Sequence, residues 1–539
     1  MADRDKKWDF HLRSLSSSAR DSNYATDPAS DPSILNSVKG VYELCRSEKS
    51  EEHVARIYPQ LNKIFQRCVA SISQTQTSNG LLLLAILQFF LDFGDRVLHD
   101  AEPSLRTFFR SCLSREFADP VVAEATLEFL SSNKIKHLKT FASLLPQFFP
   151  LMLKLIAWNG EKLENLFLRV FSGLISPGSL LPLLPALVDL PILVVALEKV
   201  EKSSGSLVGS SIASIQKSAA PEMLLALMDE AYTGSTIADG GADSESEDNA
   251  PMAASDPLFL DLLKDENDGL AERHWTTPAM SVALQAVIST PLSNRLKEAL
   301  KIAPRLLDSY FALAVQDAND SLICALIPLI MARYSTLFPD KIFSYEVQRR
   351  LLEFMLAVFH QSPHFIALLK KPIVDRLGEA YDNPTKTELA LQLCWAVGEY
   401  GGGGGSHKDE ARELFESLEL LLYENLSSRY IYNIVTSIAI VDVLVIWHNL
   451  DKFILQVARS RISDPRVWKR AQDYLGLMSE PAICLSILGP SNEAVQYPGT
   501  VDWTEGRKKM IAHIPFHLLG GQEGPPFHDF SFSDILPRE

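Results

Sequence analysis

Apolar residues recur at a helical period along most of this chain, with polar residues between them. Their spacing of three or four residues places them on one face of a helix. The clearest series are Val347, Leu351, Phe354, Met355 and Val358; Tyr58, Leu61, Ile64, Phe65, Cys68 and Ile72; and Leu414, Leu418, Leu421 and Leu422. No stretch alternates as strands joined by hairpin turns do, so the pattern predicts an all-α fold.

Helix starts are marked by a polar residue followed by proline, as in Asp119-Pro120, Ser362-Pro363 and Asp464-Pro465. The polar side chain caps free backbone N–H groups, and proline is tolerated at the first helical position. These boundaries give about twenty helices, and two such helices form a unit of about forty residues, the HEAT/armadillo period. Each pair needs neighbours to cover its apolar flanks, which favours a HEAT/armadillo-like α-solenoid over a pair of helical bundles.

Changes in composition divide the chain into five parts. We predict a flexible N-terminus at 1–31, solenoid at 32–231 and 257–489, an acidic insert at 232–256, and an irregular tail at 490–539 rich in Gly, Pro and aromatic residues. The insert is too polar and too negative to form a core, so we expect disorder. Ser244 and Ser246 stand among acids and suit an acid-directed kinase, although a solvated loop without regulation is the simpler interpretation.

Two segments allow more than one interpretation. Residues 256–266 mix acids with leucines and are either the first amphipathic helix after the insert, which we favour, or a linear peptide that docks in a partner. The tail docks either on its own solenoid, the simpler interpretation, or on a partner subunit.

Charge and cysteine content restrict the function. The 539 residues include 51 Lys and Arg against 67 Asp and Glu, a net charge of -16, which is the wrong balance for binding a phosphate backbone. The six cysteines are scattered, so neither a disulfide framework nor a zinc site is expected. The N-terminus lacks a secretory signal, and the most apolar stretches are interrupted by proline or polar residues, which predicts a soluble protein.

No motif for chemistry stands out. The chain has no phosphate-binding Gly-x-x-x-x-Gly-Lys loop, no Gly-x-Ser-x-Gly elbow and no His-Glu-x-x-His motif. His360 and His364 have the spacing of a metal pair, but Pro363 lies between them and should break the helix. We therefore predict a protein that is not an enzyme and has no cofactor.

One segment carries a resemblance to a known family. Trp395, Gly398, Glu399 and Tyr400 form a Trp-x-x-Gly-Glu-Tyr sequence similar to the trunk signature of adaptin-type large subunits. In a helical stack the tryptophan fills a large volume and the glycine admits a neighbouring helix. Together with residues 346–355 and 365–375, the chain resembles the zeta-subunit family of the fifth adaptor-protein complex, in a plant-like form.

The resemblance implies a scaffold in a heterotetramer with beta-type large, medium and small subunits. It implies association with spatacsin- and spastizin-like proteins, and a cytoplasmic protein bound peripherally to late endosomes and lysosomes through its partners, in vesicle-mediated protein transport. A HEAT-type nuclear scaffold, for transport or DNA repair, is the alternative with the same fold. A nucleotide-driven enzyme is a third hypothesis, which the absent phosphate loop disfavours.

Overall fold

The computed structural model of the chain describes residues 2–20, 32–48, 51–72, 78–204, 208–212, 262–267 and 278–382, with 386, 389–390, 392–393 and 396–397. The chain divides into two compact units, one ending at Tyr310 and the other beginning at Phe311. Within the described residues every regular element is a helix. The predicted all-α solenoid is confirmed.

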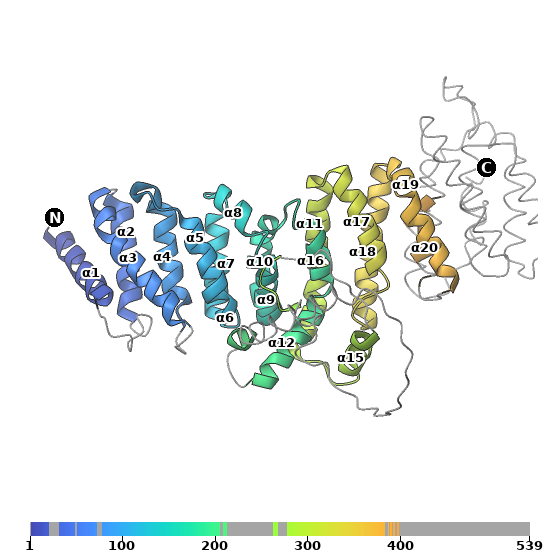
Figure 1. Cartoon of the computed structure of the whole chain (residues 1–539), viewed down its shortest axis with the longest axis horizontal. Coiled ribbons are helices and arrows are strands. Elements are labelled where there is room, and N and C mark those ends of the chain that lie inside the picture. Colours follow the sequence, from blue (N-terminus) through green and yellow to red (C-terminus); the bar gives the residue numbers. More distant parts are fainter. Residues whose placement is uncertain are drawn as a thin grey trace, which may run out of the picture. The chain divides into compact units, whose positions relative to one another are not determined.

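Most helices of the first unit stand side by side in a row (Figure 1). Its helices are α1 (Ala2–Arg20), α2 (Pro32–Glu48), α3 (Glu51–Ser71), α4 (Gly80–Phe93), α5 (Ala101–Thr107), α6 (Ser114–Glu116), α7 (Pro120–Asn133), α8 (Leu138–Leu144), α9 (Phe149–Asn159), α10 (Glu164–Phe171), α11 (Leu180–Val188), α12 (Leu190–Ser204), α15 (Pro278–Ile288) and the start of α16 (Asn294–Asp317). Short 3-10 turns are η2 (Gly94–Val97), η4 (Gly160–Leu163) and η5 (Ser172–Leu174), and η3 (Phe108–Leu113) is a π-helical turn.

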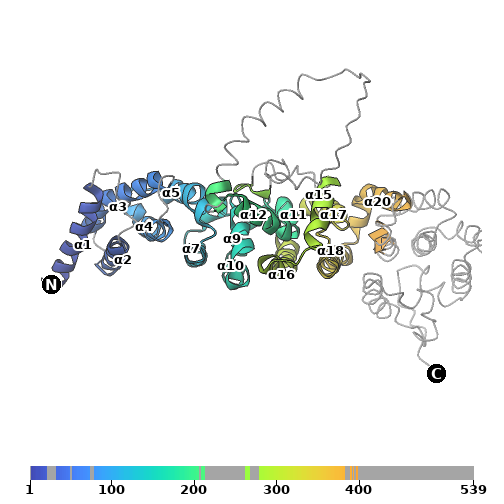
Figure 2. The same ribbon diagram turned by 90° about the horizontal axis from the view of Figure 1, so that it is seen from below.

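These helices form two layers, and each packs mainly on near neighbours in the sequence. In one layer α2 packs on α4, α4 on α7 and α7 on α10. Facing them are α3, which contacts η3, and α9, which contacts α12. Figure 2 shows α3 and α5 on one side of the row and α2, α4 and α7 on the other. Contacts limited to neighbours are the hallmark of a solenoid.

The core lies between the two layers, where the apolar stripes meet. In α3 the predicted positions Leu61, Ile64, Phe65 and Cys68 are buried, and Tyr58 is half-buried. Asp119 begins α7 as the sequence predicts: its carboxylate accepts from the Val121 N–H at 2.9 Å. The sequence pattern therefore located both the buried face and the helix start.

The second unit is helical as well in its described part. It contains the end of α16, then α17 (Asp320–Arg333), α18 (Lys341–Gln361), α19 (His364–Leu368) and α20 (Lys370–Asp382). The five predicted core positions of α18, between Val347 and Val358, are all buried. Because α18 ends at Gln361, His360 and His364 lie on different helices, as the proline between them predicts.

The helix α9 of the first unit is buried along almost its whole length. α9 buries every residue from Phe149 to Trp158, and Lys154 is the charged residue among them. No single helix in the described ranges is long and apolar enough to cross a bilayer, although two bent pairs together have the required length and composition. These pairs are Leu138–Leu144 with Phe149–Leu174, and Leu180–Val188 with Leu190–Lys202.

Acid pH will destabilise the first unit through His99. Tyr58 and Ser104 contact the two ring nitrogens, at 2.9 and 3.4 Å, and Phe90 packs on the ring. Burial lowers the pKa of His99 below its ordinary 6.5, so the unfolded chain binds this proton more readily. The contribution to stability is complete above pH 6.5 and is lost as pH falls through the folded-state pKa.

The measurement is the thermal midpoint at about pH 7.5 and about pH 5.5. We expect the thermal midpoint of the parent chain to fall between these two pH values, and that of His99→Gln to fall by less. His360→Gln, at an exposed position of α18, is the control. Equal decreases in all three proteins would contradict the assignment.

Candidate interaction site

A fully buried lysine identifies the candidate site. Lys154 has no exposed side-chain surface. Its ammonium donates to the main-chain oxygen of Leu263 and to Asp265 Oδ1, the latter at 2.7 Å, and lies 5.8 Å from the centre of the Phe117 ring. A buried ammonium is costly unless it is paired and hydrogen-bonded. Both of these acceptors lie more than a hundred residues later in the chain.

They belong to Leu262–Asn267, a short piece of chain that is irregular from Leu263 onward and that we call the docked segment. Leu262 and Leu263 are its buried anchors. The Asp265 carbonyl accepts from the Leu151 N–H at 3.3 Å, and the Asn267 N–H donates to the Gln147 carbonyl at 2.8 Å. The segment is therefore held by its backbone as well as by its side chains.

The start of α9 is suited to receive this segment. Leu151 lies in the first turn of α9, where backbone N–H groups have no acceptor within the helix. The docked segment supplies such an acceptor. The positive end of the helix dipole also favours the Asp265 carboxylate nearby.

A second carboxylate of the docked segment meets a second cation. Glu266 accepts from Arg110 in a two-point geometry, Nε to Oε1 at 2.6 Å and Nη2 to Oε2 at 2.8 Å. Gln147 Nε2 donates to the same carboxylate at 2.9 Å. The Arg110 side chain is 51% exposed, so water screens this pair and it orients the segment more than it stabilises it.

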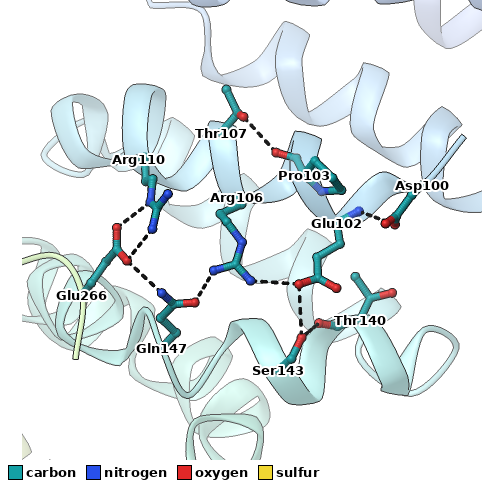
Figure 3. A network of polar contacts seen from close by, with 10 residues as sticks. All are labelled: Asp100, Glu102, Pro103, Arg106, Thr107, Arg110, Thr140, Ser143, Gln147 and Glu266. Carbon is teal, nitrogen blue, oxygen red and sulfur yellow. Dashed lines mark hydrogen bonds and ion pairs between the residues drawn. The ribbon is translucent and has the colours of Figure 1, made fainter. Parts of the chain in front are cut away.

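The polar contacts continue from the docked segment across α8 to α5, as Figure 3 shows. Gln147 Oε1 accepts from Arg106, whose other nitrogen donates to Glu102 Oε1 at 2.8 Å. Ser143 donates to the same Glu102 oxygen at 3.5 Å. Along the series Arg110, Glu266, Arg106 and Glu102, positive and negative side chains alternate, with the neutral Gln147 between Glu266 and Arg106. Each of these charges therefore has a neighbour of opposite sign.

Arg110 lies on a distorted turn. The helical stretch from Ala101 to Glu116 is interrupted by the π-helical turn η3, which carries Arg110. The Ser114 hydroxyl donates to the Arg110 carbonyl at 2.7 Å and gives that oxygen a side-chain donor. Single π-helical turns inside α-helices are frequent at functional sites because they change the direction of a side chain.

The docking face comprises Arg110, Gln147, Leu151 and Lys154, with the Gly178 carbonyl accepting from the Asn267 side chain at 3.3 Å. Sequence analysis did not find this face. The helix expected through residues 256–266 is wrong for 263–266, which are irregular. The available signal was Lys154, a lone charge in the apolar run from Phe148 to Trp158.

The site residues predicted from sequence lie outside the described residues. They are Trp395, Gly398, Glu399 and Tyr400 of the adaptin-like motif, and Ser244 and Ser246 of the acidic insert. The packing role of the motif and the phosphorylation of the serines stay predictions, as do the insert at 232–256, the tail at 490–539 and the domain boundaries. Ala396 and Val397, inside the motif, are described and buried.

Reactive chemistry is sparse in the described ranges. Cys45, Cys68 and Cys112 are buried, and burial raises the pKa of the Cys112 thiol. A raised pKa disfavours the reactive thiolate. No group of three or more metal-binding side chains comes together in the part of the chain that the structure describes.

Comparison with known proteins adds a family to this architecture. A family profile described as AP-5 complex subunit, vesicle trafficking, matches residues 29–154, and one described as AP-5 complex subunit zeta-1, C-terminal TPR repeats, matches residues 236–446. The mouse AP-5 complex subunit zeta-1 is 27% identical over 350 residues, 64% of this chain and 40% of that protein. The human protein is 25% identical over 348 residues, 64% and 39% respectively. No solved structure matches the chain significantly.

The helical row and the matched profiles define an α-solenoid of the adaptor-subunit class. The chain belongs to the family of AP-5 complex zeta subunits. Its matched region spans about 40% of the length of these curated relatives. The repeats of the second profile are of the TPR kind, another repeat of paired helices.

Proposed function

We propose that this chain is a non-catalytic scaffold subunit of a heterotetrameric adaptor complex in endosomal and lysosomal vesicle-mediated protein transport. The observation that carries the proposal is the match of residues 29–154 to a vesicle-trafficking subunit profile, over helices α2 to α8 and the start of α9. In those helices the described side chains build a packed row. A protein of this design acts through its surface.

Physical considerations support a scaffold. A row of helix pairs offers long faces on which partners bury area over many modest contacts, so binding is distributed along the helices. Basic residues near an anionic membrane contribute about 1 kcal/mol each, and this chain, with a net charge of -16, has few clusters of them. We therefore propose that partners bring it to late-endosomal and lysosomal membranes from the cytoplasm.

The proposed partners are those that the adaptor resemblance implies. They are a beta-type large subunit, a medium subunit and a small subunit, with spatacsin- and spastizin-like proteins associating with the assembled complex. No cofactor is needed for this role.

Co-purification tests the proposal. The full chain carrying an affinity tag is recovered from its native cells, and stoichiometric partners are identified by mass spectrometry. We expect medium-, small- and beta-type adaptor subunits in near-equal amounts. Recovery of nuclear proteins alone would refute the trafficking role and favour a nuclear scaffold. Tight, saturable ATP binding by the purified chain would instead revive an enzymatic role.

A further inference from the structure

We propose that the docking face is a peptide-recognition site, which the chain fills with its own Leu262–Asn267, and that this occupant exchanges with a free peptide of the same sequence. The class of ligand is a short irregular peptide with two leucines followed closely by two adjacent carboxylates. This inference does not rest on the proposed trafficking function.

Specificity is built into the docking face. Lys154 points its ammonium at Asp265 and at a main-chain oxygen of the docked segment, from a helix that is otherwise apolar from Phe149 to Trp158. An apolar side chain at this place would suit a permanent core contact, since burying a charge is expensive. A lysine instead favours one kind of occupant, a peptide that places a carboxylate next to the Lys154 ammonium.

The contacts also resemble those of a bound peptide. The segment exchanges backbone hydrogen bonds with Leu151 and Gln147, buries two adjacent leucines and places Glu266 on Arg110. Backbone hydrogen bonds supply affinity and side-chain partners supply selectivity in peptide recognition. Asp265 and Glu266 remain partly exposed, so the acidic end of the occupant lies at the surface, while its two leucines are buried.

The test uses the full chain and a dye-labelled synthetic peptide of residues 260–269, with binding followed by fluorescence anisotropy. The variant Leu263→Ala/Asp265→Asn removes an anchor and the carboxylate at Lys154, which vacates the docking face. We expect it to bind the peptide saturably and at least about tenfold more tightly than the parent chain, in which the tethered segment competes. A peptide with Asn in place of Asp265 and Gln in place of Glu266 is the matched control and should bind about tenfold more weakly.

A third variant, which adds Lys154→Met to the vacated chain, should lose the part of this difference that comes from Asp265 and keep the part that comes from Glu266 on Arg110. The proposal is overturned if the vacated chain fails to bind the peptide, or if binding is indifferent to Lys154 and to the acids. It is also overturned if the vacated chain does not fold, as judged by circular dichroism, because an exchangeable occupant is not required for the fold. Failure of the co-purification experiment would leave these results unaffected.

Discussion

Replacing Glu116 with alanine will lower the free energy of unfolding by about 2 to 4 kcal/mol. Glu116 lies on α6 and caps the start of another helix, α4. One carboxylate oxygen accepts from the Asn79 N–H at 2.9 Å, and the other accepts from the Gly80 N–H at 3.0 Å and the Ser78 hydroxyl at 2.8 Å. Alanine leaves these donors at the helix start without that acceptor, and a buried unsatisfied donor is expensive.

The measurement is the denaturant midpoint, with Glu128→Ala as the matched control. Glu128 is an exposed residue of α7, so its loss should change stability by less than about 0.5 kcal/mol. The Glu116 carboxyl is largely removed from water, and this burial raises its pKa. A Glu116→Ala midpoint equal to that of the control would show that the cap contributes nothing.

The second large effect is expected from Gly160→Ala, which should cost roughly 3 kcal/mol of stability. Gly160 ends α9 with φ 68° and ψ -147°, a backbone conformation reached almost only by glycine. An added Cβ would also overlap the Glu298 carboxylate and lie 2.9 Å from Glu298 Cδ. That carboxylate accepts from the Glu161 N–H at 3.2 Å and would have to move away.

Gly178→Ala is the matched control for this substitution. Its added Cβ finds only the Ser176 hydroxyl, at 4.0 Å, and φ at Gly178 is not positive. We expect a small change of either sign from the control and a clear drop in the thermal midpoint for Gly160→Ala. Similar midpoints for the two variants would mean that the end of α9 tolerates a side chain.

The fold was predictable because its contacts are local. A stripe such as Val347 to Val358 needs only a helical period and a buried neighbour, and both follow from the sequence. Asp119-Pro120 fixed the start of α7 through a hydrogen bond two residues away. Nothing in these features depends on distant parts of the chain.

The interaction site was not predictable by the same means. Lys154 and Asp265 meet across 111 residues, and Arg110 and Glu266 across 156. A periodic pattern of apolar residues carries no information about contacts between residues so far apart. The sequence therefore predicted a helix at 263–266 and not a segment docked on α9. The lone charge of Lys154 indicated that an opposite charge was needed, but not which carboxylate would supply it.

The docked segment also has a consequence for how the molecule assembles in time. Helices that pack on near neighbours close short loops and form quickly, whereas contacts between residues 156 apart require a slow search of the unfolded chain. We therefore expect the helices from α1 to α12 to pack on one another before Leu262–Asn267 reaches them. A competing peptide would therefore bind most readily during synthesis, while the docking face is still empty because the docked segment has not yet reached it.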